Sequence, residues 1–125
     1  MNPVPARTPQ AEILEKDGVT VVVAPGPRLD AEVAGDFRAT LLRLIARGDR
    51  KLILDLPAVD FIDSSGLGAL VSALKHLKQI DGHGDIRLAN VQPSVHAVLE
   101  IIRLNRVFAQ FRTVEEAVNS FHATV

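Results

Sequence analysis

The stretch Asp60–Leu70, DFIDSSGLGAL, joins the end of one apolar run to the start of another and carries two adjacent serines at the junction. Upstream, the run KLILDLPAV (51–59) has the continuous apolar character of a strand that is buried on both faces. Downstream, apolar residues recur at the spacing of one helical face, namely Leu67, Leu70, Val71, Leu74 and Leu77. We therefore expect the two serines to lie where a buried strand ends and a helix begins.

A serine at such a junction has several chemically reasonable roles. Ser, Asp and Asn are preferred N-cap residues because a side-chain oxygen accepts a hydrogen bond from a free backbone N–H, so Asp63 or Ser64 could simply cap the helix. The hydrolase pattern G-x-S-x-G and the phosphate-loop pattern G-x-x-x-x-G-K-[ST] are both absent around Ser64 and Ser65. The positive end of a helix tolerates a phosphate group, which leaves serine phosphorylation as the alternative to capping. We expect Gly66 to keep the first turn open to another protein.

The composition is that of one globular domain with balanced charge. Hydrophobic residues make up 47% of the 125 residues, and 14 Lys and Arg face 15 Asp and Glu, so neither a disordered nor a nucleic-acid-binding chain is indicated. The absence of cysteine excludes disulfides and thiol chemistry. No apolar stretch approaches the roughly 18 residues of a membrane helix, and the N-terminus lacks a signal-peptide core. We expect a cytoplasmic protein that contacts neither nucleic acid nor membrane.

The domain organisation follows from the same inspection. The proline-rich residues 1–10 are predicted to form a flexible lead-in, and residues 11–125 a single domain. The segment DGHGD (81–85) is typical of a glycine-rich loop between a helix and a strand, so no metal and no cofactor are expected. The four histidines are scattered and mark no general base, so we do not expect an enzyme.

The periodicity predicts an opening hairpin followed by alternating helices and strands. Two β-type runs flank Asp17-Gly18, a pair suited to a tight turn. Helices are expected over 30–48, 65–80, 93–104 and 113–125, with strands at 51–59, 86–91 and 107–112. The inward residues of the first and third helices are predicted to be Val33, Phe37, Leu41, Leu44 and Ile45, and Val95, Val98, Leu99 and Ile102.

Three helix ends carry recognisable signals. Asp30 is a plausible N-cap and Gly48 a plausible C-terminal stop for the first helix, and Thr113 with Glu116 has the spacing of a capping box. The order β-β-α-β-α-β-α-β-α implies an α/β fold, with a mostly parallel mixed sheet, an antiparallel N-terminal hairpin and about four helices. Asp30 and the serine pair both follow strands, so we expect them at the same edge of the sheet.

The string DLPAVDFIDSSGLGAL (55–70) resembles the signature of STAS domains, and specifically that of bacterial anti-sigma factor antagonists of the partner-switching type. The segment RLDAEVA (28–34) is similar to the family's G-x-L-D-x-x-T-A segment, and residues 86–118 resemble the C-terminal half of the family. The resemblance covers about residues 11–120. It implies a single STAS domain over 11–125.

The resemblance also implies a function and its residues. Ser64 takes the place of the family's phosphoacceptor. The residues expected near it, in recognition, are Asp30, Asp63, Ser65, Gly66 and Leu67. An antagonist of this kind binds a serine-kinase anti-sigma factor of histidine-kinase-like ATPase fold when unphosphorylated. It is released when phosphorylated, which regulates sigma-factor-dependent transcription, and a serine phosphatase resets it.

Two departures and one alternative accompany the resemblance. Pro27 stands where the family usually has a glycine before the Leu-Asp pair, and Val33 replaces the usual threonine. The sequence therefore does not determine the conformation of the Asp30 loop. STAS domains also serve as subunits of larger assemblies, such as lipid-transport ABC complexes or stress-signalling scaffolds. A small enzyme or nucleotide binder of the same fold class has no supporting motif.

Overall fold

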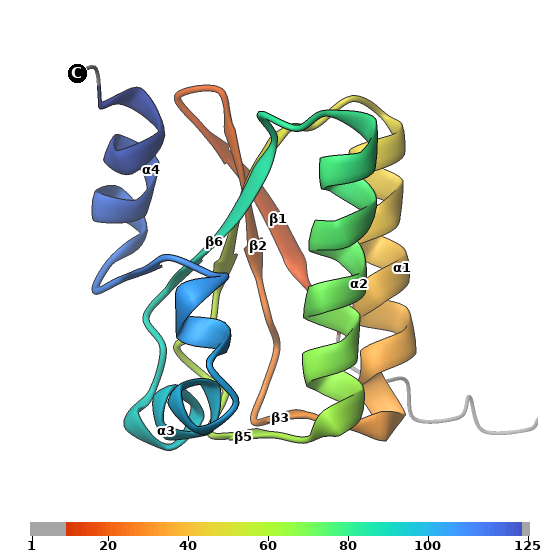
Figure 1. Ribbon diagram of the computed structural model, residues 1–125, viewed down its shortest axis with the longest axis vertical. Coiled ribbons are helices and arrows are strands. Elements are labelled where there is room, and N and C mark those ends of the chain that lie inside the picture. Colours follow the sequence, from red (N-terminus) through yellow and green to blue (C-terminus); the bar gives the residue numbers. More distant parts are fainter. Residues whose placement is uncertain (1–9, 124–125) are drawn as a thin grey trace, which may run out of the picture.

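A five-stranded mixed sheet forms the centre of the molecule in the computed structural model, which describes residues 10–123 (Figure 1). The strands lie in the order β1 (Glu12–Lys16), β2 (Val19–Val23), β4 (Lys51–Asp55), β6 (Asp85–Ala89) and β7 (Gln110–Phe111). Among these five strands, the β1–β2 pair is antiparallel and the other neighbouring pairs are parallel. The predicted α/β fold with an N-terminal hairpin is therefore confirmed. The predicted lead-in falls almost wholly on residues 1–9, outside the described residues.

The hairpin and the parallel strands form for the reasons visible in the sequence. Asp17 and Gly18 both have positive φ, 51° and 77°, which is the geometry of the tight hairpin turn. In β4, Leu52 and Leu54 pack into one hydrophobic cluster and Ile53 into another, because successive side chains of a strand point to opposite faces. The continuous apolar run therefore is a strand buried on both faces.

In the described part of the chain, four α-helices cover the sheet: α1 (Ala31–Ala46), α2 (Ser64–Ile80), α3 (Pro93–Ile101) and α4 (Val114–His122). Figure 1 shows α1 and α2 side by side on one side of the sheet and α4 on the other. The larger cluster unites α1, α2 and α3 with the sheet, through residues such as Phe37, Leu70 and Leu99. The smaller one places Ala117 and Val118 of α4 against the opposite face.

The helix ends agree with their sequence signals. Asp30 is the N-cap of α1, and Gly48 follows the helix with a positive φ of 113°. At α4, the Thr113 hydroxyl accepts a hydrogen bond from the Glu116 N–H at 3.1 Å. The Glu116 carboxylate accepts from the Arg112 N–H at 3.3 Å, one residue before the capping-box position.

Some predicted core positions were wrong. Val71 and Ile102 are exposed rather than inward, because the buried side of α2 is rotated toward the small residues Ala69 and Ala73, and because α3 ends at Ile101. Among the other predicted inward residues, Val33, Leu67 and Val98 are half-buried. The rest are buried, as Phe37 and Leu99 illustrate.

The predicted last strand is also shorter than expected. Of residues 107–112, only β7 pairs with β6, because a single turn of 3₁₀ helix, η1 (Leu104–Arg106), precedes it. Phe108 then enters the main core instead of extending the strand. Two further strands of two residues each, β3 (Arg28–Leu29) and β5 (Phe61–Ile62), were not predicted.

Candidate phosphoacceptor site

The two unpredicted strands build the site, because they pair with each other as a separate parallel ladder. Arg28 is paired with Phe61, and Leu29 with Ile62. This register brings the next residue of each strand, Asp30 or Asp63, to equivalent positions at the starts of α1 and α2. Asp30 and the serine pair are therefore neighbours, as expected, although they follow this separate ladder and not an edge of the five-stranded sheet. Figure 1 shows β3 and β5 side by side, next to the lower ends of the two helices.

Asp63 is the N-cap of α2 and also reaches the start of α1. Its Oδ1 accepts hydrogen bonds from the N–H groups of Ser65 and Gly66, at 2.9 and 3.0 Å, so the predicted cap is Asp63 and not Ser64. Its Oδ2 accepts from the N–H of Ala31 at 3.3 Å. One carboxylate therefore binds the positive N-terminal ends of two neighbouring helices.

Ser64 and Ser65 are the first two residues of α2, and both are exposed. Because the Asp63 carboxylate accepts from the N–H groups of Ser65 and Gly66, neither serine hydroxyl serves as the N-cap. The hydroxyls therefore lie in solvent beside the positive end of a helix, where an added phosphate is favoured electrostatically.

Gly66 and Leu67 both have structural roles, and that of Gly66 was not predicted from the sequence. A Cβ atom on Gly66 would overlap the Leu29 carbonyl oxygen and lie 2.8 Å from Cγ1 of Ile62. Gly66 is therefore required for close packing of α2 on the β3–β5 ladder, a different reason from the open first turn that the sequence suggested. Leu67 is half-buried and packs against the main core.

Asp30 is held by interactions on both carboxylate oxygens. The Arg28 guanidinium donates to Oδ2 at 3.0 Å, and the Glu32 N–H donates to Oδ1 at 3.1 Å. The hydrogen bond from Arg28, aided by that from Glu32 and opposed by desolvation, holds the pKa of the Asp30 carboxyl below its ordinary value. Asp30 is therefore held as an ionised carboxylate at the start of α1, paired with Arg28.

Arg28 and Phe61 are site residues that sequence reasoning missed. The Arg28 guanidinium lies 4.1 Å from the centroid of the exposed Phe61 ring, in cation–π geometry. The two face each other only because of the β3–β5 register, and a two-residue strand is too short to show a periodicity. The one sequence signal for a role of Arg28 was its position two residues before Asp30.

The loop before Asp30 contains Pro27 in place of the family's usual glycine and is hydrogen-bonded to the segment before the serines. The Gly26–Pro27 peptide is cis, and the Pro27 carbonyl accepts hydrogen bonds from the N–H groups of Asp60 and Phe61 at 2.8 and 3.3 Å. Gly26 has a positive φ of 54° and lies against the Ala58 backbone, so a side chain there would clash. The loop before Asp30 is therefore fixed to the loop before the serines.

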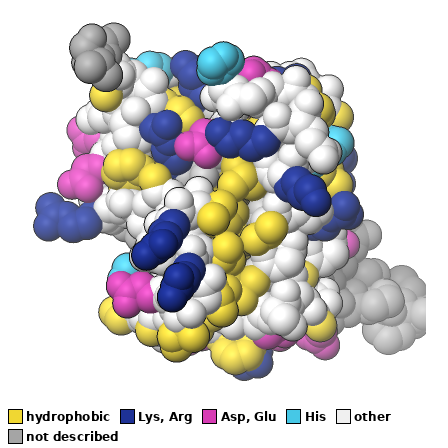
Figure 2. Space-filling view, in the orientation of Figure 1, with side chains coloured by type: hydrophobic (Ala, Val, Ile, Leu, Met, Phe, Trp, Pro, Cys, Tyr) yellow, Lys and Arg dark blue, Asp and Glu magenta, His cyan; other side chains and the backbone are white. Residues whose placement is uncertain are grey.

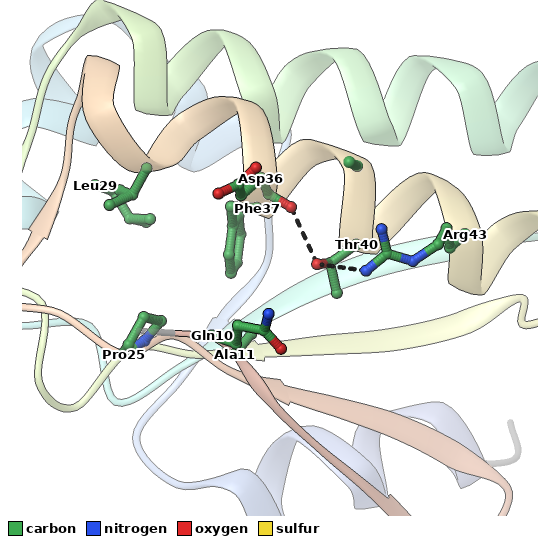
Figure 3. A pocket seen from close by; sticks show the side chains of 10 residues that line it. Gln10, Ala11, Pro25, Leu29, Asp36, Phe37, Thr40 and Arg43 are labelled. Carbon is green, nitrogen blue, oxygen red and sulfur yellow. Dashed lines mark hydrogen bonds between the residues drawn. The ribbon is translucent and has the colours of Figure 1, made fainter. Parts of the chain in front are cut away.

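A cavity of about 170 Å³ lies behind the site, between α1 and the first strands (Figure 3). Leu29 and Phe37 line it, and Thr40 accepts a hydrogen bond from Arg43 at 3.2 Å at its polar end. Neither Ser64 nor Ser65 is among the lining residues. The candidate phosphoacceptor therefore belongs to the open surface and not to the cavity.

Comparison with known families decides the classification of the chain. A model of the STAS domain matches residues 10–117. The chain belongs to the STAS domain family. The match includes both strand-to-helix junctions of the site.

The most similar curated relatives support a subgroup within that family. The chain is 29% identical to BtrV of Bordetella bronchiseptica over 105 residues, which cover 84% of this chain and 88% of that protein. It is 31% identical to a protein of Thermotoga neapolitana over 98 residues, covering 78% and 85%. Both are named as anti-sigma factor antagonists. The homologues of this STAS domain are thus anti-sigma factor antagonists.

Solved structures agree with this placement. An anti-sigma factor antagonist of Thermotoga maritima superposes with a TM-score of 0.81 at 25% identity, over 90% of this chain and 95% of that one. The antagonist SpoIIAA in its unphosphorylated form has a TM-score of 0.70 at 21% identity over 91% and 99%, which shows a shared fold. A part of the murine anion transporter Slc26a9 also shares the fold, with a TM-score of 0.71 at 23% identity over 89% of this chain and 19% of that one. Within residues 10–123, none of the helices is long and apolar enough to cross a membrane.

Proposed function

We propose that this STAS domain is an anti-sigma factor antagonist that works by partner switching. Unphosphorylated, it binds a serine-kinase anti-sigma factor of histidine-kinase-like ATPase fold, and so frees a sigma factor. Phosphorylation of Ser64 by that kinase ends the complex, and a serine phosphatase restores it. In this scheme the chain is a substrate of both enzymes and catalyses neither reaction.

The observation that carries the proposal is the exposed Ser64 at the first residue of α2, freed from capping by Asp63. A kinase needs an accessible hydroxyl, and a phosphate at a capped helix start disturbs the fold least. The fixed β3–β5 ladder and the capped helix start provide such a site.

The effect of the phosphate follows from charge. Phosphorylation adds about −1.5 to −2 charges, and its effect on the helix itself is favourable and no more than about 2 kcal/mol. The added charge lies near the carboxylates of Asp30, Asp60 and Asp63, which are not all neutralised by neighbouring cations. In a docked and partly dehydrated interface, an unpaired charge costs roughly 2–5 kcal/mol. Loss of the partner is therefore the expected result, with little change in the fold.

The relatives supply independent support. BtrV and the Thermotoga proteins are named as antagonists of anti-sigma factors, and SpoIIAA has been solved in both unphosphorylated and phosphorylated forms. The phosphorylated SpoIIAA structure superposes on this chain with a TM-score of 0.68 at 23% identity. A STAS domain of this fold can therefore carry a phosphate without losing its structure.

The test is direct phosphorylation. The protein is incubated with ATP and each purified serine-kinase anti-sigma factor of its own organism, and the product is mapped by mass spectrometry. We expect one phosphate on Ser64, none in Ser64→Ala, and normal incorporation in the matched control Ser65→Ala. Phosphate found mainly on Ser65, or unchanged incorporation into Ser64→Ala, would exclude Ser64 as the acceptor.

A further inference from the structure

The surface that runs away from Ser64 along α2 differs in charge from the rest of the chain. The seventeen residues of α2 include Lys75 and Lys78 and no carboxylate. The segment 101–111, which contains η1, includes Arg103 and Arg106 and no carboxylate. The whole chain has a formal net charge of −1, so these two elements form a local excess of positive charge.

Exposed apolar side chains accompany these cations. Val71 of α2 is 37% exposed, and Val107, just after η1, is 48% exposed. Figure 2 shows hydrophobic side chains gathered in a strip between α2 and the η1 region, with Lys and Arg side chains on both sides. We use the name α2–η1 strip for the apolar residues that these two elements and the residue after η1 leave at the surface: the exposed Val71 and Val107, and the half-buried Leu67 and Leu104, which pack on the same main core.

The α2–η1 strip is continuous with the candidate phosphoacceptor. Positions 64, 68, 71 and 75 are separated by four, three and four residues, so Ser64, Val71 and Lys75 follow one another along a single side of α2. On the other border, α3 lies against β5, and the Ser94 hydroxyl donates to the Asp60 carbonyl at 2.8 Å. A partner that reaches the Ser64 hydroxyl is therefore adjacent to the strip.

The end of α3 adds a further sign of an interaction surface. Ile101 is 80% exposed and Ile102 45%, although neighbouring Leu99 is fully buried. Arg103, between them and η1, has a left-handed backbone with φ 62°, which is uncommon for residues other than glycine. Large apolar side chains rimmed by charges typically mark protein-binding surfaces.

We infer that the α2–η1 strip is a second contact surface for the kinase that phosphorylates Ser64, and that it receives an acidic element of that kinase with an apolar centre. This inference rests on the proposed function. Charge complementarity identifies the occupant, since Lys75, Arg103 and Arg106 have no ion-pair partner among the residues that the structure describes. A second copy of this chain is the wrong occupant, because a two-fold interface would set the cations of the strip against themselves.

In this interpretation, the two parts of the surface have different roles in kinase binding. The Ser64 end of the surface carries Asp60 and Asp63 in addition to the Arg28–Asp30 ion pair, so it is acidic, and it carries the switch. The α2–η1 strip is basic and apolar. Its cations attract the acidic element of the kinase whether or not Ser64 is phosphorylated. The strip therefore sets which kinase binds, whereas Ser64 sets when it leaves.

The experiment measures binding of the unphosphorylated full chain to the purified kinase by calorimetry. The charge variant Lys75→Glu/Arg106→Glu is compared with Lys51→Glu, an exposed lysine on β4. The apolar variant Val71→Ser is compared with Ile80→Ser, which is exposed at the far end of the same helix. We expect the charge variant to weaken binding at least tenfold, Val71→Ser several-fold, and both controls less than twofold. The salt dependence of binding should be shallower in the charge variant.

The outcomes separate the two hypotheses. If the wild-type chain binds the kinase and the strip variants bind as tightly as their controls, the α2–η1 strip is not a contact surface, while the proposed function stands. If the wild-type chain binds none of the organism's kinases of this class, both are refuted. Thermal melts show that each variant is folded, so a loss of binding cannot come from unfolding.

Discussion

Asp30 illustrates how one side chain at this site serves both the fold and the surface. One carboxylate oxygen caps α1 through Glu32, and the other pairs with Arg28, which in turn covers the Phe61 ring. Asn caps a helix about as well as Asp but carries no charge. Asp30→Asn therefore removes the charge while keeping the cap. The same reasoning makes Asp30→Ala a combined test of both roles.

We predict that Asp30→Asn folds normally and changes the rate of Ser64 phosphorylation several-fold. The matched control is Asp36→Asn, an exposed position further along α1 that accepts no cap hydrogen bond. Rates are measured with the cognate kinase at saturating ATP. A wild-type rate in Asp30→Asn would mean that Asp30 is a cap and nothing more.

The lowered pKa of Asp30 gives this residue a second, pH-dependent signature. Its folded-state pKa lies below the ordinary value of 3.8, so its ion pair stabilises the fold above that pH. The stability is lost as the pH falls through the lowered folded-state pKa. We predict that the difference in unfolding free energy between the wild type and Asp30→Asn is constant at neutral pH and shrinks below about pH 4. A difference that is unchanged down to pH 2 would contradict this assignment.

At the scale of elements, the packing of α2 on the β3–β5 ladder depends on one glycine. Gly66→Ala would force a methyl group into the Leu29 carbonyl and against Ile62, so we predict a loss of roughly 1–3 kcal/mol of unfolding free energy in urea. Gly68→Ala is the control, because a methyl group at that position would meet no atom within 4 Å, and it should stabilise α2 by roughly 0.5–1 kcal/mol. Equal effects of the two substitutions would show that the close approach is not rigid.

A second element contact, between α3 and β7, is sensitive to pH. His96 Nδ1 lies 2.9 Å from the Gln110 side-chain oxygen, and Nε2 lies 2.7 Å from the Glu100 carboxylate. A neutral imidazole can donate to only one of these acceptors, whereas the protonated ring donates to both. The hydrogen bonds to Gln110 and then to Glu100 therefore raise the pKa of His96 above its ordinary 6.5, against desolvation.

The sign of this linkage is opposite to that of Asp30. A raised folded-state pKa means that the contact stabilises the fold below pH 6.5 and is lost as the pH rises through the raised value. We predict that an NMR titration finds the His96 pKa above 6.5 and that Gln110→Ala moves it down. A pKa that does not respond to Gln110→Ala would assign the shift to another group.

The elements also show where sequence reasoning succeeds and where it stops. The hairpin at Asp17-Gly18 and the long helices were predictable because turn chemistry and helical periodicity are local properties. The β3–β5 ladder was not, since its strands are two residues long and pair across more than thirty positions. The site shares this limit: the serine motif was visible, but the Arg28–Phe61 contact exists only through that pairing.

At the scale of the whole molecule, the structure separates the response of the fold from the response of the partner. The main core joins α1, α2 and α3 to the sheet, and Ser64 lies outside it on the surface. A phosphate at the start of α2 meets the positive end of a helix, so its effect on the fold is at most about 2 kcal/mol. Its effect on a docked partner is larger, because the neighbouring carboxylates cannot be hydrated there.

We therefore predict that phosphorylation changes the melting temperature by no more than about 12 °C, since 1 kcal/mol shifts a domain of this size by roughly 3–6 °C and the effect on the fold is at most about 2 kcal/mol. In the same samples, affinity for the kinase should fall at least about thirtyfold, the factor that corresponds to roughly 2 kcal/mol. The two measurements are made on one preparation of protein phosphorylated by the kinase, with Ser64→Ala carried through the same treatment as control. High salt should recover part of the affinity, because it screens the repulsion between the phosphate and the carboxylates. A collapse of the fold on phosphorylation would show that the phosphate acts through unfolding of α2 and not at the interface.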